Sequence, residues 1–387
     1  MLDLLRDLLA IPSPSGYTDS IVRFVCEELN RLEIEFELTR RGAIRATIPG
    51  KHRRPNRAVV AHLDTLGAMV TQLKDNGRLA VSPIGTWSAR FAEGARVTVF
   101  CDDEEHHYRG TIMPLKASGH VYHHQIDTQP VAWENLEVRL DEAVDNADDL
   151  FGRAIRVGDF VAVDPQPEFT PNGFIVSRHL DNKAGVAVLM AATKAILDAG
   201  IKVPIDSHLL FTIFEEVGSG ASAVLHQDVA EMVSIDNATP APGQNSTEYD
   251  MTIAAMDSFG PFDYHLTHKL LRLAREFELP HRRDVFKYYR CDAASAVESG
   301  NDIRTALACF GVDGSHGYER THEKSLMTLA QLIALYMQSP ATVPRDRMRL
   351  GPLKGFTDQP TEAPPVPEKQ ERGSHTHSTD IDGSAQS

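Results

Sequence analysis

Short apolar runs that end in polar residues alternate along this chain with longer stretches of helical periodicity. Four of the runs end in a histidine or a carboxylate, and these cover residues 58–64, 175–181, 209–216 and 232–236. Apolar side chains recur at helical spacing in other stretches, which are residues 1–10, 18–32, 182–199, 261–278 and 323–338. This alternation predicts an α/β fold, in which a mixed, mostly parallel sheet is flanked by helices.

The pattern changes between about residues 70 and 172. Short β-prone stretches are separated there by Gly, Pro and acidic turns, and few helical patterns occur. We therefore expect a small inserted domain, β-barrel-like in form, at residues 70–172, between two parts of an α/β domain at residues 1–69 and 173–340. After Pro340 the composition shifts to Pro, Thr, Glu, Lys, Gly and Ser, which predicts a disordered tail over residues 341–387.

The composition indicates a globular protein. Hydrophobic residues make up 42% of the chain and charged residues 24%, and the formal net charge is -15. This negative charge argues against a general affinity for nucleic acid or for an anionic membrane. The four cysteines form no CxxC pair, no run approaches the roughly 20 apolar residues of a membrane span, and the N-terminus lacks the basic region of a signal peptide. We therefore expect a cytoplasmic protein.

The polar residues that end the apolar runs suit a pair of metal ions. In an open α/β sheet, ligands bind outside the carboxyl ends of the strands, so side chains that follow several buried strands gather at one edge of one sheet. A neutral imidazole, here His62, and carboxylates such as Asp181 and Asp236 suit Zn²⁺, Co²⁺ or Mn²⁺. Hydrolysis also needs a carboxylate that takes the proton of water, and the neighbours Glu215 and Glu216 can divide metal binding and base chemistry between them.

Each of these residues also has an ordinary structural explanation. Asp64 lies two residues after His62, so in a continuing strand it can fix the tautomer of the imidazole, but a buried strand-end histidine is often simply satisfied by a neighbouring acid. Asp181 precedes a predicted helix, where N-capping is common, and Asp236 suits a strand-exit turn. The acids at 215–216 suit the start of a helix. The combination is more informative than any one of its members.

Together the motifs resemble those of the co-catalytic metallopeptidases of clan MH, and most closely the tetrahedral aminopeptidase (glutamyl aminopeptidase-like) family. The segment 61–67, Ala-His-Leu-Asp-Thr-Leu-Gly, resembles the first metal motif of that family, and the segment 180–185, Leu-Asp-Asn-Lys-Ala-Gly, resembles its bridging-aspartate motif. The segment 214–218, Phe-Glu-Glu-Val-Gly, resembles its pair of base and ligand. The resemblance covers residues 1 to about 340, and it implies a phosphorylase/hydrolase-like sheet with an inserted β domain.

The resemblance also implies a role for each residue. Two divalent ions per subunit, Zn, Co or Mn, would share Asp181, and the full set of ligands would be His62, Asp181, Glu216, Asp236 and His322. Glu215 would be the general base, and Asp64 would orient His62. The substrate would be a peptide or a small peptide-like amide that loses its N-terminal residue. The family forms shells of twelve subunits, which implies a homo-oligomer, and a dodecamer in particular.

Two segments depart from the family pattern or add to it. The family commonly has Arg-Tyr-x-His-Ser as its last motif, whereas residues 315–323 read Ser-His-Gly-Tyr-Glu-Arg-Thr-His-Glu, so His316 is a rival to His322 as the last ligand. Segment 282–293 is unusually basic, which indicates either an acidic or amide-bearing substrate or a solvated loop. Segments 177–181 and 315–322 also resemble a subgroup encoded beside the synthesis of the osmoprotectant N-acetylglutaminylglutamine amide.

Two other functions stay open at this point. A metal-dependent deacylase or amidase of small N-acyl amino acids or dipeptides would use the same residues, and substrates with a blocked or a free amine would separate it from an aminopeptidase. A non-catalytic scaffold would hold its metals for stability alone. A spare Glu215 beside a metal ligand argues against the scaffold, because a structural site needs no base.

Overall fold

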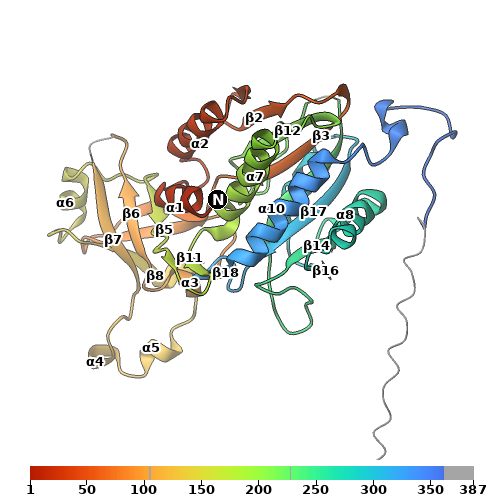
Figure 1. The fold of residues 1–387 in the computed structure, drawn as a ribbon. Coiled ribbons are helices and arrows are strands. Elements are labelled where there is room, and N and C mark those ends of the chain that lie inside the picture. Colours follow the sequence, from red (N-terminus) through yellow and green to blue (C-terminus); the bar gives the residue numbers. More distant parts are fainter. Residues whose placement is uncertain (104–105, 227, 361–387) are drawn as a thin grey trace, which may run out of the picture. The chain divides into compact units, whose positions relative to one another are not determined.

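A nine-stranded mixed sheet forms the centre of the α/β part of the chain (Figure 1). The computed structural model describes residues 1–103, 106–226 and 228–360. The strand order is β1-β2-β12-β3-β13-β17-β14-β15, and β16 pairs with β14. The strands are β1 (Phe36–Leu38), β2 (Ile44–Ile48), β12 (Ile205–Thr212), β3 (His52–His62), β13 (Val229–Ala238), β17 (Arg304–Gly311), β14 (Met251–Asp257), β15 (Gly260–Pro261) and β16 (His281–Val285).

The four central strands, β12, β3, β13 and β17, run parallel to one another. The apolar run Ala58–Ala61 of β3 is almost fully buried, as expected for a strand that is covered on both faces. Parallel strands share one direction, so their carboxyl ends meet at one edge of the sheet. The predicted α/β fold class is confirmed. The central pairs are parallel, and the pairs at the margins are antiparallel except for that of β14 with β16, which is parallel.

Two long helices, α7 (Leu180–Asp198) and α10 (Glu323–Gln338), pack side by side on one face of this sheet (Figure 1). α7 contacts β3, β13 and the short helix α1, and it is buried around most of its circumference, which explains its nearly uniform apolar sequence. This packing brings the N-terminal residues of α7 to the edge where the parallel strands end. The remaining helices of this part are α1 (Leu2–Ala10), α2 (Asp19–Arg31), α8 (Tyr264–Glu276) and α9 (Asp292–Glu298).

Strand β11 (Phe174–Ser177) lies outside the main sheet, so the prediction that run 175–181 ends one of its strands was wrong. β11 pairs instead with β10 (Glu168–Phe169) and β18 (Glu319–His322) in a separate three-stranded antiparallel sheet. The periodicity of a short apolar run does not reveal its partner strands, which here are supplied by a distant segment. Asp181 therefore reaches the sheet edge from the start of α7.

The inserted β domain is a closed barrel of six antiparallel strands, as predicted. In barrel order the strands are β4 (Gly67–Leu73), β5 (Leu79–Ile84), β8 (Leu136–Leu140), β7 (His107–Pro114), β6 (Arg96–Phe100) and β9 (Phe160–Val163). A core of its own fills the barrel, with Leu79, Val97 and Val138 fully buried. The short helices around it are α3 (Ala89–Ala92), α4 (Gly119–Tyr122), α5 (Gln125–Thr128), α6 (Ala147–Gly152) and the 3₁₀ helix η1 (Trp133–Asn135).

The chain stays packed beyond residue 340, where the sequence predicts the start of a tail. The 3₁₀ helix η2 (Pro344–Arg347) follows buried Val343, and Asp346 forms an ion pair with Arg304 of β17. Residues up to 351 belong to one compact unit, and the described residues from 352 to 360 lie outside that unit. The predicted tail segment 361–387 lies outside the described residues. Across the part of the chain that the structure describes, every helix is too short or too polar to cross a membrane.

Candidate metal centre

Six imidazole and carboxylate side chains lie together at the carboxyl edge of the main sheet. They are His62, Asp181, Glu215, Glu216, Asp236 and His316. Two overlapping sets have ligand atoms within 4.8 Å of one another, namely His62, Glu215 and Asp236, and His62, Asp181 and Glu216. The structure thus brings together all the ligands and the base that the sequence predicts, except for His322.

The register of the parallel strands brings His62 and Asp236 together. β3 and β13 pair as far as Val60 opposite Ser234, and His62 and Asp236 each lie two residues further along. Residues at equal register in neighbouring parallel strands point to the same face of the sheet. The imidazole and the carboxylate therefore face the same side.

The carboxylate of Asp181 lies between two imidazoles. Its Oδ1 is 3.1 Å from Nε2 of His62, and its Oδ2 is 3.3 Å from Nε2 of His316. Asn237, the neighbour of Asp236 in β13, donates a hydrogen bond from Nδ2 to Oδ2 of Asp181 at 2.8 Å. One oxygen of Asp181 faces each histidine, which is the arrangement needed for a carboxylate that bridges two ions.

Asp64 fixes the turn that carries Glu215 and Glu216. The backbone N–H of Glu215 donates to Oδ1 of Asp64 at 3.1 Å, and that of Glu216 donates to Oδ2 at 3.2 Å. The hydroxyl of Ser15 also donates to Oδ2. For His62, the nearest acceptor is the main-chain oxygen of Asp64, 2.9 Å from Nδ1, whereas Oδ1 of Asp64 is 3.6 Å away. Asp64 thus orients His62 through its main chain and holds the two glutamates through its carboxylate.

The two glutamates face different histidines. Oε2 of Glu215 is 3.7 Å from Nε2 of His62, and the Glu215 side chain is 12% exposed. Oε2 of Glu216 is 3.7 Å from Nε2 of His316, and the Glu216 side chain is only 4% exposed. Within the described chain, Oε1 of Glu216 is buried without a hydrogen-bond partner. A buried carboxylate oxygen without a partner is costly, so Glu216 suits a metal ligand better than Glu215 does.

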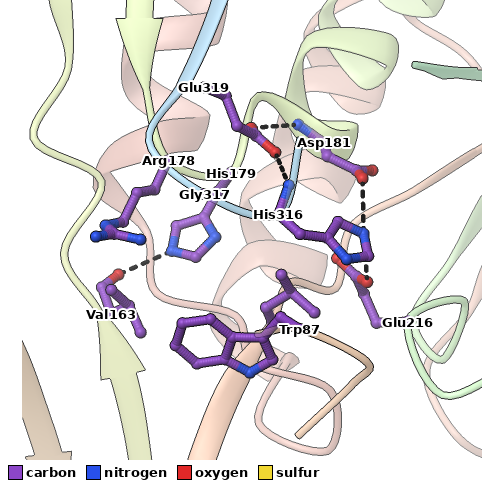
Figure 2. A pocket seen from close by; sticks show the side chains of 10 residues that line it. Trp87, Val163, Arg178, His179, Asp181, Glu216, His316, Gly317 and Glu319 are labelled. Atoms are coloured by element: carbon purple, nitrogen blue, oxygen red, sulfur yellow. Dashed lines mark hydrogen bonds and ion pairs between the residues drawn. The ribbon is translucent and has the colours of Figure 1, made fainter. Parts of the chain in front are cut away.

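His316 occupies the place that the sequence analysis gave to His322 (Figure 2). Figure 2 shows its imidazole between Asp181 and Glu216. His316 lies in the loop before β18 with a φ of 64°, and its Nδ1 is 2.8 Å from the main-chain oxygen of Thr86 in the barrel segment. If Nδ1 carries the proton and donates it to that oxygen, Nε2 is free to bind a metal.

Both ring nitrogens of His322 are engaged elsewhere. Its Nδ1 accepts a hydrogen bond from the backbone N–H of Lys324 at 3.1 Å, which caps the start of α10. Its Nε2 is 3.0 Å from the main-chain oxygen of Asn172. The pairing of β18 with β11 places His322 opposite Phe174, away from the edge of the main sheet. The structure thus places His322 apart from the cluster to which the sequence analysis assigned it, because the sequence does not reveal this pairing.

Glu319, which the sequence analysis did not single out, holds two members of the cluster in place. Its Oε2 accepts a hydrogen bond from the backbone N–H of Asp181 at 3.1 Å, and its Oε1 accepts one from the backbone N–H of His316 at 3.0 Å (Figure 2). Glu319 is buried and belongs to β18. In the sequence, Glu319 is a lone acid between the two candidate histidines. Its role can be recognised only when the position of β18 beside the centre is known.

Burial is the main influence on the pKa values of the carboxylates. It raises the pKa values of Glu215 and Glu216 well above their ordinary range, and burial together with the charge of Asp181 raises the pKa of Asp236 to about 7. Burial would also raise the pKa of Asp181, but hydrogen bonds with the two histidines hold it below its ordinary value. Burial lowers the pKa of His316, yet contact with Asp181 and Glu216 raises it to about 10.

The cluster therefore carries more buried negative charge than its surroundings neutralise. Among the described residues, no lysine or arginine forms an ion pair with Asp181, Glu215, Glu216 or Asp236, and the cationic partners are the two histidines. Divalent cations would replace the protons that the histidines and the carboxyl groups with raised pKa values hold in the metal-free protein. They would also give Oε1 of Glu216 a partner. Imidazole nitrogens and carboxylate oxygens form a donor set that suits Zn²⁺, Co²⁺ or Mn²⁺. The residues present fit a metal centre.

The cluster opens into a cleft of about 1240 Å³. The acids and His316 line one part of it. The other walls come from the barrel segment, from residues 239–244 after β13, and from the loop between β16 and α9. Among the wall residues are Trp87, Phe91, Phe286, Lys287, Tyr289 and Arg290. A concave site of this size, with apolar walls and a few polar groups, accommodates a ligand of peptide size.

Comparison with known proteins agrees with this geometry. The matching family model is that of the M42 glutamyl aminopeptidase family, and it covers residues 42–332. A curated relative, YhfE of Bacillus subtilis (strain 168), carries a provisional aminopeptidase name. YhfE is 37% identical over 342 residues, which is 88% of this chain and 97% of YhfE.

Solved structures share the fold. Aminopeptidase APDkam598 from the archaeon Desulfurococcus kamchatkensis has a TM-score of 0.79 at 21% identity, and the match covers 90% of this chain and 96% of that one. The TET1 peptidase of Pyrococcus horikoshii has a TM-score of 0.76 at 20% identity, with 87% and 98% covered. The α/β sheet with its inserted barrel is thus an arrangement found in solved aminopeptidase structures.

Proposed function

The chain belongs to the M42 glutamyl aminopeptidase family and is a metallo-aminopeptidase, and we propose that it removes N-terminal residues from peptides or small peptide-like amides with two metal ions. The observation that carries the proposal is the position of the Asp181 carboxylate. One of its oxygens is 3.1 Å from Nε2 of His62, and the other is 3.3 Å from Nε2 of His316. A carboxylate placed in this way supports two ions that share one ligand.

The remaining ligands follow from their positions around Asp181. We assign His62 and Asp236 to one ion and Glu216 and His316 to the other, with Asp181 shared between them. This assignment replaces His322 by His316. Ions bound there would polarise a peptide carbonyl and lower the pKa of water.

Glu215 is the carboxylate that this assignment leaves for proton transfer. Its side chain lines the cleft, and its backbone is held by Asp64. The attacking water gives a proton to the Glu215 carboxylate, and Glu215 then delivers that proton to the amine nitrogen as the C–N bond breaks.

The basic segment 282–293 contributes less free positive charge to the cleft than its sequence indicates. Arg282 forms an ion pair with Asp250 at 2.7 Å, and Arg290 forms one with Glu298. Lys287 lines the cleft and has no ion-pair partner among the residues described. We therefore assign the preference for acidic or amide-bearing substrates that the sequence suggested to Lys287.

We also propose that the protein is a homo-oligomer. The TET1 peptidase of Pyrococcus horikoshii, which has the same fold, is described as assembling into a tetrahedron or a large octahedral shell. A dodecamer would have twelve times the 42.7 kDa mass of this chain. Size-exclusion chromatography with light scattering tests this proposal, and a monomer at micromolar concentration would contradict it.

The test of the proposed activity is hydrolysis of a panel of aminoacyl-p-nitroanilides by the metal-reconstituted protein. Activity should require Co²⁺, Zn²⁺ or Mn²⁺, and Glu215→Gln should lower kcat by about 10²–10⁴-fold while the protein keeps its metal. Glu323→Gln makes the same chemical change at the start of α10 and should leave kcat unchanged.

The same panel distinguishes the other functions. Hydrolysis of N-acetylated substrates alone would replace the aminopeptidase by a deacylase or amidase, and metal binding without any hydrolysis would favour a scaffold. N-acetylglutaminylglutamine amide is included in the panel to test the link to this compound that segments 177–181 and 315–322 predict.

A further inference from the structure

Asp292 is a buried carboxylate near the metal centre that the mechanism above does not use. It is the first residue of α9 and is only 2% exposed. Its Oδ2 accepts a hydrogen bond from the hydroxyl of Thr212 at 2.6 Å. Thr212 ends β12 and lies opposite His62 in the parallel register, so both side chains point to the same face of the sheet. The carboxylate of Asp292 is therefore fixed at the edge where the metal ligands gather.

The turn that carries Glu215 returns to the carboxylate of Asp292. The turn is closed by the backbone N–H of Gly218, which donates to the main-chain oxygen of Glu215 at 2.7 Å. Two residues later the chain reaches Gly220. A Cβ atom on Gly220 would lie 2.0 Å from Oδ1 of Asp292 and 3.1 Å from Cα of Glu215. Gly220 thus packs directly against both the carboxylate of Asp292 and the backbone of Glu215.

A second contact fastens α9 to the same turn. The hydroxyl of Ser295 accepts a hydrogen bond from the backbone N–H of Ala221, the neighbour of Gly220, at 2.9 Å. The same hydroxyl donates to the main-chain oxygen of Asp292 at 3.0 Å. The start of α9 is therefore tied to the segment on both sides of the turn, through Thr212 before it and Ala221 after it.

The stability of α9 alone does not explain this arrangement. An acid in the first turn of a helix is stabilised by the helix dipole while it stays in solvent. Asp292 is instead buried, which is costly for a carboxylate, and its hydroxyl partner lies 80 positions earlier in the chain. Its contacts with Thr212 and Gly220 both lead to the turn that carries Glu215.

We propose that Asp292 is a positioning residue for Glu215, whose carboxylate is fixed by Thr212 and supports the turn at Gly220. The inference rests on the proposed function, in which Glu215 is the general base.

Two carboxylates would then hold the base from two sides. Asp64 accepts the backbone N–H of Glu215, and Asp292 packs against the residue that contacts its Cα. A displacement of a reacting group by about 1 Å can lower a rate by about 100-fold. Loss of the support from Asp292 should therefore lower kcat even in a folded protein that is loaded with metal.

Two competing explanations predict different results. If Asp292 acts on the neighbouring ligand Glu216, its loss should weaken metal binding first and the rate only as a consequence. If Asp292 only stabilises the fold, its loss should lower the free energy of unfolding and leave the kcat of the folded, metal-loaded protein unchanged. A residue that acts through Glu215 should lose its effect once Glu215 is replaced, because coupled residues are not additive.

The experiment removes the support in two ways. Thr212→Val deletes the hydroxyl with little change in shape, Thr212→Ser keeps the hydroxyl, and Asp292→Ala deletes the carboxylate. Thr328→Val is the matched control, because it makes the same change at a buried threonine of α10, whose hydroxyl donates to the main-chain oxygen of Lys324. The measurements are kcat and KM on the best aminoacyl-p-nitroanilide, the metal affinity and the free energy of unfolding.

Thr212→Val and Asp292→Ala should lower kcat by about 10–100-fold, with little change in KM or metal affinity. Thr212→Ser and Thr328→Val should keep the wild-type kcat. In the Glu215→Gln background, Thr212→Val should lower the remaining rate by no more than about twofold.

Three results with an active wild type would overturn the inference. They are a wild-type kcat in Thr212→Val, a fall in metal affinity that accounts for the lower rate, and an equal loss of rate when Glu215 is already glutamine. Thr212→Val decides the question by itself if Asp292→Ala does not fold. A wild-type protein that hydrolyses no free-amine substrate would overturn the proposed function and this inference with it, and the wild-type measurement identifies that failure separately.

Discussion

Replacement of Glu319 by glutamine tests whether a side chain that holds the proposed metal ligands in place controls metal binding. In the wild type, the two carboxylate oxygens accept hydrogen bonds from the backbone N–H groups of Asp181 and His316, at 3.1 and 3.0 Å. A glutamine has one acceptor oxygen and one NH₂ group. It can therefore satisfy only one of the two N–H groups, and the other must face a donor.

The size of the effect follows from that mismatch. A buried donor left without a partner costs about 1–3 kcal/mol, and each 1.4 kcal/mol corresponds to about tenfold in an equilibrium constant. The affinity for the ion held by His316 should therefore fall by about 10–100-fold, which is also the usual range for a lost partner of a metal ligand.

The stability of the metal-free Glu319→Gln variant should not fall along with its metal affinity at high pH. Burial, together with the charge of Asp181, raises the pKa of Glu319 to about 8. A carboxyl group with a raised pKa binds a proton more tightly in the folded state, so its contribution to stability is greatest at low pH and is lost as the pH rises through about 8. Since glutamine carries no charge, the metal-free variant should be no less stable than the wild type at pH 9.

The assay is competition for metal with a chromogenic chelator, together with thermal unfolding of the metal-free protein at pH 6 and pH 9. Glu323→Gln is the control, because it removes a glutamate charge from the first turn of α10 without touching Asp181 or His316. Equal metal affinities in wild type and Glu319→Gln would refute the reasoning. So would a matching loss of affinity in Glu323→Gln.

Three further predictions concern the last ligand, pH and a buried ion pair. His316→Ala should remove one ion and abolish hydrolysis, whereas His322→Ala should keep both ions and cost about 1 kcal/mol of stability through the lost cap of α10. Elemental analysis measures the bound metal, and urea unfolding measures the stability. Loss of an ion in His322→Ala but not in His316→Ala would restore His322 as the ligand. Burial and a stacked neighbouring histidine lower the pKa of His208 to about 4, so the unfolded state takes up this proton first and stability should fall by up to about 3 kcal/mol as the pH drops from about 6.5 to about 4. Urea midpoints at pH 7, 6 and 5 check this, and an equal slope in His208→Asn would contradict it. Arg57→Met breaks the buried pair with Glu231, 3.1 Å long, and should cost about 3–5 kcal/mol in urea unfolding; a loss below about 1 kcal/mol would refute a structural role for the pair.

Most elements of the fold could be predicted from local patterns. The last long helix was predicted at the bounds it has in the structure, Glu323–Gln338, because its apolar residues recur at helical spacing and its ends carry polar residues. The barrel segment was visible from short β-prone stretches divided by turns. His62 and Asp236 could be placed together because each ends an apolar strand, and parallel strands end at one edge of the sheet.

The sequence did not reveal which of two histidines, six residues apart, faces Asp181. That choice depends on the pairing of β18 with β11, which fixes His322 beside Asn172 and leaves His316 in the loop at the centre. The strand partners lie far apart in the chain, and no local periodicity encodes their register.

The sequence by itself determined the elements, their order and the chemical types that meet at the sheet edge, because burial imposes a period of about 3.6 residues on helices and of 2 on strands. Only the tertiary structure decided the contacts of single atoms. It gave Asp64 the backbone N–H groups of both glutamates, and it gave Glu319 those of Asp181 and His316. Such contacts join residues far apart in the chain at distances of about 3 Å, and they depend on how whole elements pack.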